Sequence, residues 1–486
     1  MTNTQNSVRH SGKRYTVASL ALGLTLLGAA AACSDRLTVP NYQNPTPESI
    51  QGDPVSALPL LVSGVLRNDR DNATGYVLGL GILGREVYNY TPTEGRNTSG
   101  YLSPEVKTPT SFGGVSNWNG FYTELRNAVG LEGTVNGAAA GLFTDARKSA
   151  TLGFAHTVEG LALSYVIASR YNLGAPVDVA PDPAILTPFV SRDSVYRNIV
   201  ARLDQAKGEL SAGGTAFPFT LHSGYAGFNT PANYLKFNRG LAARINAYRA
   251  SIGASGCGAA RSAACYNTVL ANLAESFINP AGSLTVGPFN VYSSAASDVA
   301  NGISNQSNTS VVAHAKADSG IQLRADGTKD LRFTTKVFTL AATKKPSNAT
   351  LGVGTNFDYT TYSVRESPVP ILRNEELILL RAEARYFTGD VAGALSDINV
   401  IRVTAGGLAP LVGFANDQAF IDELLYNRRL SLVFEGHRWV DMRRFGRLNQ
   451  LTLDLPTHVI ISELPVPQNE CLSRALADAS LKGPGC

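Results

Sequence analysis

The sequence predicts a mainly α-helical protein with long irregular loops and a few short strands. Two observations support this prediction. Apolar residues recur at helical spacing in segments that come in pairs, and two long polar stretches without that spacing lie between the pairs. The clearest helical segments are 148–171, 191–210, 231–252, 262–278, 374–387, 391–403 and 417–434.

Short breaks join these segments, which places consecutive helices side by side. Gly389-Asp390, for example, separates 374–387 from 391–403. The apolar residues of each helix in this pair share one face. They are Leu377, Leu380, Ala384 and Phe387 on the first helix and Ala394, Ile398 and Ile401 on the second. Such pairs stack as tetratricopeptide repeats do, although the strict repeat signature is absent, so we expect a superhelix of degenerate pairs.

The N-terminal segment 1–32 predicts a lipoprotein signal peptide. Its basic residues precede an apolar run at 17–27, and alanines at 30–32 stand directly before Cys33. A cysteine at the start of the mature chain can carry diacylglycerol, so Cys33 is the expected lipidation site and the lipid is the expected membrane anchor. An ordinary secretory cut nearby is the alternative.

The charge balance excludes nucleic acid as an expected partner. Residues 1–32 hold three basic and no acidic residues, so removing them reduces the 42 basic residues to 39, against 38 acidic ones. Phosphate binding requires a concentrated basic face, and the sequence has none. Beyond the leader, no apolar run approaches the roughly 18 to 20 residues that span a bilayer. We therefore expect the mature protein at a membrane surface rather than across it.

The four remaining cysteines predict two disulfides. Cys257 with Cys265, and Cys471 with Cys486, would close short loops, which suits an oxidising compartment outside the cytoplasm. Four free thiols are the alternative. A zinc site is disfavoured because neither pair has the Cys-x-x-Cys spacing.

Two polar insertions, 85–119 and 282–362, are expected to form ordered loops with a few short strands. Loops this long tend to carry function. They hold more aromatic residues than a disordered segment would. These residues are Tyr88, Tyr90, Tyr101, Phe112 and Trp118 in the first insertion and Phe289, Tyr292, Phe357, Tyr359 and Tyr362 in the second.

The sequence contains no nucleophile elbow, zinc-protease helix, Walker loop or calcium-loop pattern. Residues 79–84 match the dinucleotide fingerprint, but no β-branched strand precedes them, so these glycines predict close helix packing instead. Glu375 and Glu376 are adjacent on a helix and point apart, which favours first-turn acids over a glycosidase pair. His156 and Glu159 lie one helical turn apart, but a single pair does not make a metal site. We expect neither a metal nor a cofactor.

The most densely charged segment is 435–444, with the sequence EGHRWVDMRR. Its charges alternate with apolar residues, so some of the charged side chains must be buried, and buried charges need partners. Pairing of Arg438 with Asp441, or of Glu435 with a nearby arginine, would provide them. We expect a structural ion-pair network, with Trp439 as a wedge between helices. The residues assigned to this motif are Glu435, Gly436, Arg438, Asp441 and Arg444.

This segment resembles the signature of the SusD/RagB family, surface lipoproteins that capture nutrients for TonB-dependent outer-membrane transporters. Three other stretches resemble that family in the same order: CSDRLTVPN at 33–41, NEELILLRAEA at 374–384 with the helix 394–402 after it, and LPVPQNE at 464–470. The sequence departs from the pattern at Asn427 and Ser431, where the family usually has glutamates. It departs again at Leu464, where the usual residue is tyrosine.

The resemblance implies a helical scaffold of four tetratricopeptide-like pairs, with irregular segments that bind the ligand and contact a SusC-like barrel. It divides the chain into the signal peptide 1–32, an N-terminal region 33–230 and a C-terminal region 231–486, the last two packed as one body. It also implies a non-catalytic, lipid-anchored protein at the surface of the outer membrane. Such a protein would capture a glycan or similar oligomer and deliver it to a SusC-like TonB-dependent transporter.

Sugars present flat C–H faces to aromatic rings and hydroxyl groups to polar side chains, so the aromatic residues of the insertions are the candidates for ligand contact. The expected ligand-binding residues are Tyr88, Tyr90, Tyr101, Trp118, Asn119 and Tyr292. Trp118 has a competing interpretation as a core residue, because apolar residues follow it at helical spacing. For the function, an envelope scaffold lipoprotein and a glycoside hydrolase are the alternatives.

Overall fold

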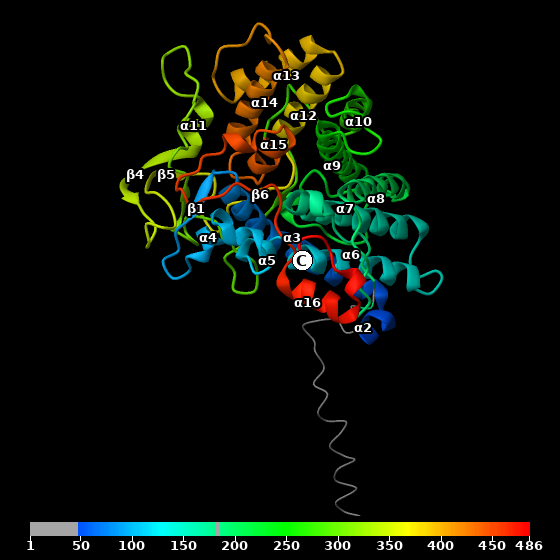
Figure 1. Cartoon of the computed structure of the whole chain (residues 1–486). Helices are drawn as coiled ribbons and strands as arrows, with labels where there is room; N and C mark the ends of the chain where they lie inside the picture. The colour runs from blue at the N-terminus through cyan, green and yellow to red at the C-terminus, as the bar shows by residue number, and fades with distance from the viewer. Residues whose placement is uncertain (1–46, 181, 183) are drawn as a thin grey trace, which may run out of the picture. The chain divides into compact units, whose positions relative to one another are not determined.

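The computed structural model of the chain describes residues 47–180, 182 and 184–486 (Figure 1), so the predicted signal peptide 1–32 and the predicted lipidation site Cys33 lie outside the described residues. The chain divides into two compact units, Met1–Asp53 and Pro54–Cys486. Helix α2 (Pro47–Gly52) belongs to the first unit. The boundary near residue 230 stays a prediction. The remaining elements belong to the second unit.

Helices dominate the second unit, as Figure 1 shows. The helices of its first half are α3 (Pro54–Leu83), α4 (Arg96–Leu102), α5 (Phe112–Ser116), α6 (Asn119–Gly137), α7 (Asp145–Arg170), α8 (Arg192–Ala212) and α9 (Pro231–Ile252). Those of its second half are α10 (Ala263–Ala274), α11 (Leu331–Lys336), α12 (Asn374–Phe387), α13 (Val391–Thr404), α14 (Asp417–Ser431), α15 (Arg438–Arg444) and α16 (Gln468–Ala477). Short 3₁₀ turns lie at Pro104–Lys107, Tyr171–Leu173, Ser223–Tyr225, Leu448–Gln450 and Ala479–Leu481.

The seven predicted helical segments are confirmed, and α9 and α12 have the predicted ends. Local signals explain this agreement. The Thr230 side chain accepts a hydrogen bond from the Asn233 N–H at the start of α9, and Pro231 occupies the first helical position. The sequence pattern does not single out α3, because its polar stretch 67–72 interrupts the apolar period.

Neighbouring helices pack in order along the chain. The packed pairs include α6 with α7, α7 with α8, α8 with α9, α9 with α10, and α12 with α13. Small residues permit the close crossing of α7 and α8: a Cβ atom on Gly160 would lie 2.9 Å from Leu203 Cδ2, and one on Gly153 would lie 2.7 Å from Leu210 Cγ. The predicted mainly helical stack of tetratricopeptide-like pairs is confirmed.

Among the residues that the structure describes, six short strands form three antiparallel pairs: β1 (Val87–Asn89) with β3 (Val311–Ala313), β2 (Phe289–Asn290) with β6 (Val369–Pro370), and β4 (Val337–Lys344) with β5 (Thr355–Tyr359). In the first pair Tyr88 stands opposite Val312. This pairing joins the two polar insertions, which are more than 160 residues apart along the chain at their nearest ends. The few short strands expected within these loops are present.

Both expected disulfides are formed. Cys257 bonds to Cys265 in the loop between α9 and α10, and Cys471 of α16 bonds to Cys486 at the end of the chain. The alternative of four free thiols is therefore wrong. Among the helices that the structure describes, none combines the length and apolar character needed to cross a membrane.

Candidate functional site

The charged segment 435–444 lies at the centre of a buried ion-pair network. Glu435 Oε1 accepts a hydrogen bond from Arg373 Nη2 at 2.7 Å, and its Oε2 accepts one from Arg373 Nε at 3.2 Å. Asp441 accepts hydrogen bonds from Arg428 Nε at 2.7 Å and from Arg444 Nε at 2.9 Å. The predicted structural network is thus present, and it ties α15 to α14 and to the start of α12.

Of the two pairings expected for this segment, that of Glu435 with a nearby arginine is confirmed and that of Arg438 with Asp441 is wrong. Arg428 and Arg444 occupy both oxygens of Asp441, and the Arg438 side chain makes no ion pair with it. Gly436 provides the turn before α15: its φ of +81° is in the left-handed region, and a Cβ there would lie 2.8 Å from the Tyr76 ring. Trp439 is buried, and its Nε1–H donates to the Ile461 carbonyl at 3.0 Å, which fits the predicted wedge.

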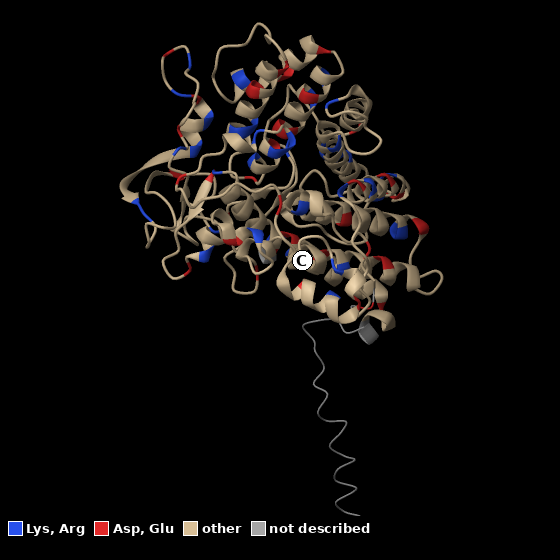
Figure 2. Ribbon diagram, viewed as in Figure 1, with Lys and Arg blue, Asp and Glu red and all other residues tan. Residues whose placement is uncertain are grey.

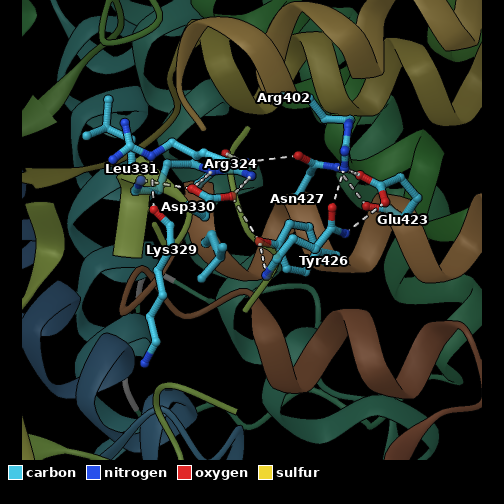
Figure 3. A network of polar contacts seen from close by, with 12 residues as sticks. Arg324, Lys329, Asp330, Leu331, Arg402, Glu423, Tyr426 and Asn427 are labelled. Carbon is cyan, nitrogen blue, oxygen red and sulfur yellow. Dashed lines mark hydrogen bonds and ion pairs between the residues drawn. The ribbon is translucent and has the colours of Figure 1, made fainter. Parts of the chain in front are cut away.

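Asn427 and Ser431, the two departures from the family pattern, contact the same arginine. Arg332 Nη1 donates to Asn427 Oδ1 and to Ser431 Oγ, each at 3.0 Å. Asp330 balances the charge of Arg332 through hydrogen bonds of 2.7 and 3.1 Å. Figure 3 shows the surroundings of Asp330 and Asn427, with Tyr426 donating to Asp330 at 2.9 Å. A neutral asparagine and serine suffice here because the arginine already has its carboxylate.

The adjacent acids Glu375 and Glu376 are both buried, and each pairs with a different arginine. Glu375 pairs with Arg373, and Glu376 accepts from Arg244 Nε at 2.7 Å. Burial alone would raise both pKa values, but the arginines lower the pKa of each carboxyl to about 2. Neither side chain can therefore act as a general acid near neutral pH, which agrees with the interpretation as first-turn acids of α12.

The expected aromatic ligand platform is wrong in one respect: its five aromatic side chains are buried. Tyr88 has no exposed surface, and its hydroxyl donates to Asp454 at 2.8 Å. Its ring stacks between Tyr90 and His314, at centroid distances of 4.8 and 4.7 Å. The Tyr90 hydroxyl donates to the Val353 carbonyl at 2.6 Å. Neither tyrosine offers a free ring face to a ligand.

The other expected ligand residues lie apart from this stack. Trp118 is buried against Tyr122 and Phe189, which supports its competing interpretation as a core residue. Tyr101 is buried as well, and so is Tyr292, whose hydroxyl donates to the Arg70 carbonyl at 3.0 Å. Asn119, the first residue of α6, is exposed, and its role in ligand binding stays a prediction.

The burial of these rings has a physical cause. The insertions have no long helices to bury, and their aromatic side chains instead supply apolar area that joins the main hydrophobic core of the second unit. The pairing of β1 with β3 seals Tyr88 beneath the second insertion. The same side chains that indicate an ordered loop are therefore used to hold it together.

Within the described part of the chain, we consider two surface clefts as candidate ligand sites. We call the first the Tyr426 cleft. It has a volume of about 260 Å³ and is lined by Asp422, Leu425, Tyr426, Arg429, Arg438, Asp441, Met442 and Gln450. We call the second the Lys107 cleft. It has a volume of about 420 Å³ and is lined by Lys107, Leu173, Ile460, Ile461, Ser462, Glu463, Pro465 and Gly485. An aromatic ring lines only the first of these two clefts.

The Tyr426 cleft combines a half-buried ring with charged and amide groups. Burial and the nearby Arg429 lower the pKa of Arg438 to about 10, so its guanidinium remains charged at neutral pH. Asp422 and Gln450 are exposed at the rim. The sequence pattern does not single out these residues. The one available signal is that Tyr426 is an aromatic side chain within a predicted helix. Away from the cleft, Figure 2 shows acidic and basic residues interspersed along the helices.

The described residues also contain one group with metal-ligand chemistry. Glu132, His156 and Glu159 place one ligand atom each within 4.8 Å of one another. The dinucleotide fingerprint, by contrast, lies at the end of α3, and a Cβ on Gly84, the residue after the helix, would meet the Trp439 backbone nitrogen at 3.2 Å. Those glycines serve helix packing, as expected.

The protein is a stack of helix pairs with long loops that are joined by short strands. A buried arginine–carboxylate network links α12, α14 and α15. The model of the SusD family matches residues 266–473, so this part of the chain is similar to that family. A SusD-like protein of Formosa agariphila is 30% identical over 106 residues. That match covers 19% of this chain and 21% of the length of the relative.

Solved structures resemble the chain over most of its length. A SusD superfamily protein from Bacteroides vulgatus has a TM-score of 0.63 at 14% identity, covering 87% of this chain and 97% of that one. The surface glycan-binding protein A from Bacteroides thetaiotaomicron, in complex with laminarihexaose, has a TM-score of 0.64 at 14% identity, covering 89% and 99%. NanU of B. fragilis has a TM-score of 0.62 at 13% identity, covering 90% and 99%. These similarities confirm the SusD-like fold predicted from the sequence.

Proposed function

We propose that the protein binds an oligosaccharide and does not cleave it. The observation that carries the proposal is the shared fold with a glycan-binding protein whose structure holds laminarihexaose, over 89% of this chain. The family match over residues 266–473 supports it as well. The buried, arginine-paired state of Glu375 and Glu376 counts against the hydrolase alternative that this acidic pair suggests.

We place the ligand in the Tyr426 cleft. A sugar ring can pack its C–H face on Tyr426, while Arg429, Arg438 and Asp422 supply charged partners for hydroxyl groups. Tyr426 is held in place because its hydroxyl donates to Asp330 Oδ2 and accepts from the Gln322 N–H at 3.1 Å. A fixed ring loses little entropy on binding, which favours this cleft over the Lys107 cleft, whose lining has no aromatic ring.

We further propose that the protein works at the cell surface, attached to the outer membrane through a lipid on Cys33. There it would pass its ligand to a SusC-like TonB-dependent transporter. The family match and the lipoprotein-like leader support this role. Mass spectrometry of the membrane fraction should find diacylglycerol on Cys33, and affinity purification should recover a TonB-dependent barrel. An unacylated protein, or recovery of an envelope assembly machine in place of the barrel, would contradict this part of the proposal.

The binding site can be tested by native affinity electrophoresis against a panel of polysaccharides that includes laminarin. Gln450→Ala removes an exposed amide at the rim of the Tyr426 cleft, and we expect it to weaken retardation at least threefold. Gln468→Ala, an equally exposed glutamine of α16, is the matched control and should bind as the unmodified protein does. Equal retardation of both variants would exclude the Tyr426 cleft as the site.

A further inference from the structure

Three adjacent helices bring a histidine and three carboxylates together. Glu132 comes from α6, His156 and Glu159 come from α7, and Glu209 comes from α8. These helices pack against one another, α7 lying between the other two in the packing order (Figure 1). The sequence indicates only the pair His156 and Glu159, because the other two carboxylates reach the site through tertiary packing.

The geometry suits a small cation with nitrogen and oxygen ligands. One ligand atom each from Glu132, His156 and Glu159 lies within 4.8 Å of the others, and His156 Nε2 is 3.3 Å from Glu132 Oε2. In a tetrahedral zinc site with ligand bonds of about 2.1 Å, neighbouring ligand atoms are about 3.4 Å apart. The histidine and Glu132 already have this separation, and Glu159 requires only a small adjustment.

Glu209 orients the imidazole ring. Its Oε2 lies 2.7 Å from His156 Nδ1, so a proton on Nδ1 is held there and Nε2 faces Glu132, with the Gln205 amide nitrogen 3.4 Å away. Gln205 supports Glu209 by donating from Nε2 to Glu209 Oε1 at 3.0 Å. A carboxylate that binds the second nitrogen of a histidine is the usual outer partner of a metal-bound imidazole.

Glu159 gives an independent indication of a ligand. Its side chain is fully buried, and neither of its oxygens takes part in a hydrogen bond in the structure. Arg202 is its ion-pair partner, and Arg202 has other acceptors in Asn198 Oδ1 at 2.7 Å and the Val177 carbonyl at 3.0 Å. Because Arg202 Nη1 is already ion-paired with Oε2, Oε1 is the buried oxygen without a partner. A buried carboxylate oxygen without a partner is costly, so Oε1 is suited to a further cation.

The charges agree with this interpretation. The carboxylates of Glu132, Glu159 and Glu209 exceed Arg202 and a protonated His156 by one negative charge. A divalent ion that replaces the proton on His156 Nε2 brings the group to neutrality. Glu132 and Glu209 keep 23% and 16% of their side-chain surface exposed, which leaves a path for the ion from solvent.

We propose that Glu132, His156 and Glu159 bind a divalent transition-metal ion of the Zn²⁺ class, with Glu209 as the positioning residue of the histidine. An imidazole ligand favours Zn²⁺ over Ca²⁺ or Mg²⁺, which prefer oxygen ligands. The ion would join α6 to α7 next to α8, within the helix stack and outside the Tyr426 cleft. The ion would stabilise the helix stack and would not contact the glycan.

The test is isothermal titration of tag-free, EDTA-treated protein with Zn²⁺, and with Ca²⁺ in parallel. We expect one Zn²⁺ per chain and no binding of Ca²⁺ at this group. Glu132→Gln removes a ligand whose side chain is partly exposed and should weaken Zn²⁺ binding at least tenfold; Glu209→Gln should weaken it about tenfold. Glu105→Gln, on the exposed turn Pro104–Lys107, is the matched control and should leave the affinity unchanged.

The melting temperature provides a second readout. Zn²⁺ should raise it in the unmodified protein and in Glu105→Gln, and should leave it unchanged in Glu132→Gln. Absence of stoichiometric Zn²⁺ binding would overturn the proposal. So would equal affinity of Glu132→Gln and the unmodified protein, or Ca²⁺ binding that both glutamine variants abolish. Glycan binding is measured separately, so a failure here leaves the proposed function intact.

Discussion

Arg444 of α15 holds Glu383 of α12 through two parallel hydrogen bonds, Nη1 to Oε1 at 2.5 Å and Nη2 to Oε2 at 2.8 Å. Both side chains are buried. The contact joins the two stretches that carry the strongest family resemblance, 374–384 and 435–444, and Asp441 extends it to Arg428. The segment 435–444 therefore links the helix pair α12 and α13 to α14 and α15 through buried ion pairs. We call this set of ion pairs the clamp.

Removing one partner of this clamp should destabilise the fold strongly. Glu383→Gln leaves the Arg444 guanidinium buried with a single carboxylate, and we expect a loss of about 3–5 kcal/mol in the free energy of unfolding. Lys207→Met breaks the exposed pair with Glu275 and should change it by less than about 1 kcal/mol. Urea unfolding of both variants compares them, and similar losses would contradict the structural role of the clamp.

Trp118 should act as a core residue. It is buried and packs on Tyr122 and Phe189, so Trp118→Ala should lower the free energy of unfolding by about 3–5 kcal/mol. Asn119→Ala, one residue later and exposed, should change it by less than about 0.5 kcal/mol. Loss of glycan binding in Trp118→Ala at an unchanged melting temperature would instead indicate that Trp118 contacts the ligand.

The disulfide at the C-terminus should stabilise the end of the chain. Cys471 and Cys486 are 15 residues apart, and a loop of that length corresponds to about 3 kcal/mol in the chain-entropy model. The Cys471→Ser, Cys486→Ser double variant should lose roughly this amount, as measured by denaturant unfolding under oxidising conditions. The Cys257–Cys265 loop spans 8 residues and should contribute somewhat less, about 2.5 kcal/mol. An unchanged free energy of unfolding in this double variant, or in the Cys257→Ser, Cys265→Ser double variant, would contradict the observed pairing.

Glu86 should make the fold less stable as the pH rises from about 4.5 to 7. Burial raises the pKa of its carboxyl from 4.5 to about 7 in the folded chain, against the opposing effect of Arg438. The folded state therefore holds the proton where the unfolded state has lost it, so stability is highest below 4.5 and falls as the pH rises through this range. Glu375 has the opposite effect on stability, because its pKa in the folded chain is lowered from 4.5 to about 2. The stability that it contributes is lost only as the pH falls from about 4.5 toward 2.

The variant Glu86→Gln isolates this effect. Compared with the variant, the unmodified protein should be roughly 2–3 kcal/mol less stable at pH 8 than it is at pH 5, which follows from the size of the pKa shift. The charged groups that act on Glu86, namely Arg438, Arg429 and Glu435, are the same in both proteins. Parallel pH profiles of the free energy of unfolding for the two proteins would contradict the assignment.

The helices were predictable because their signals are local. Thr230 and Pro231 mark the start of α9, and Asp390, whose side chain accepts from the Gly393 N–H, marks the start of α13. The site was less predictable because its parts are distant in sequence. No local pattern indicates that β1 pairs with β3 and buries Tyr88, or that Arg428 displaces Arg438 from Asp441. Likewise, the packing of α6 and α8 on α7 brings Glu132 and Glu209 to His156.

A single titration shows whether the protein binds a polysaccharide without cleaving it. Purified protein is titrated with the polysaccharide of the panel that retards it most, and the same sample is then assayed for new reducing ends. The account predicts a saturable binding isotherm, weakened in Gln450→Ala, and no increase in reducing ends over the incubation. An increase in reducing ends, or no isotherm with any polysaccharide of the panel, would contradict it.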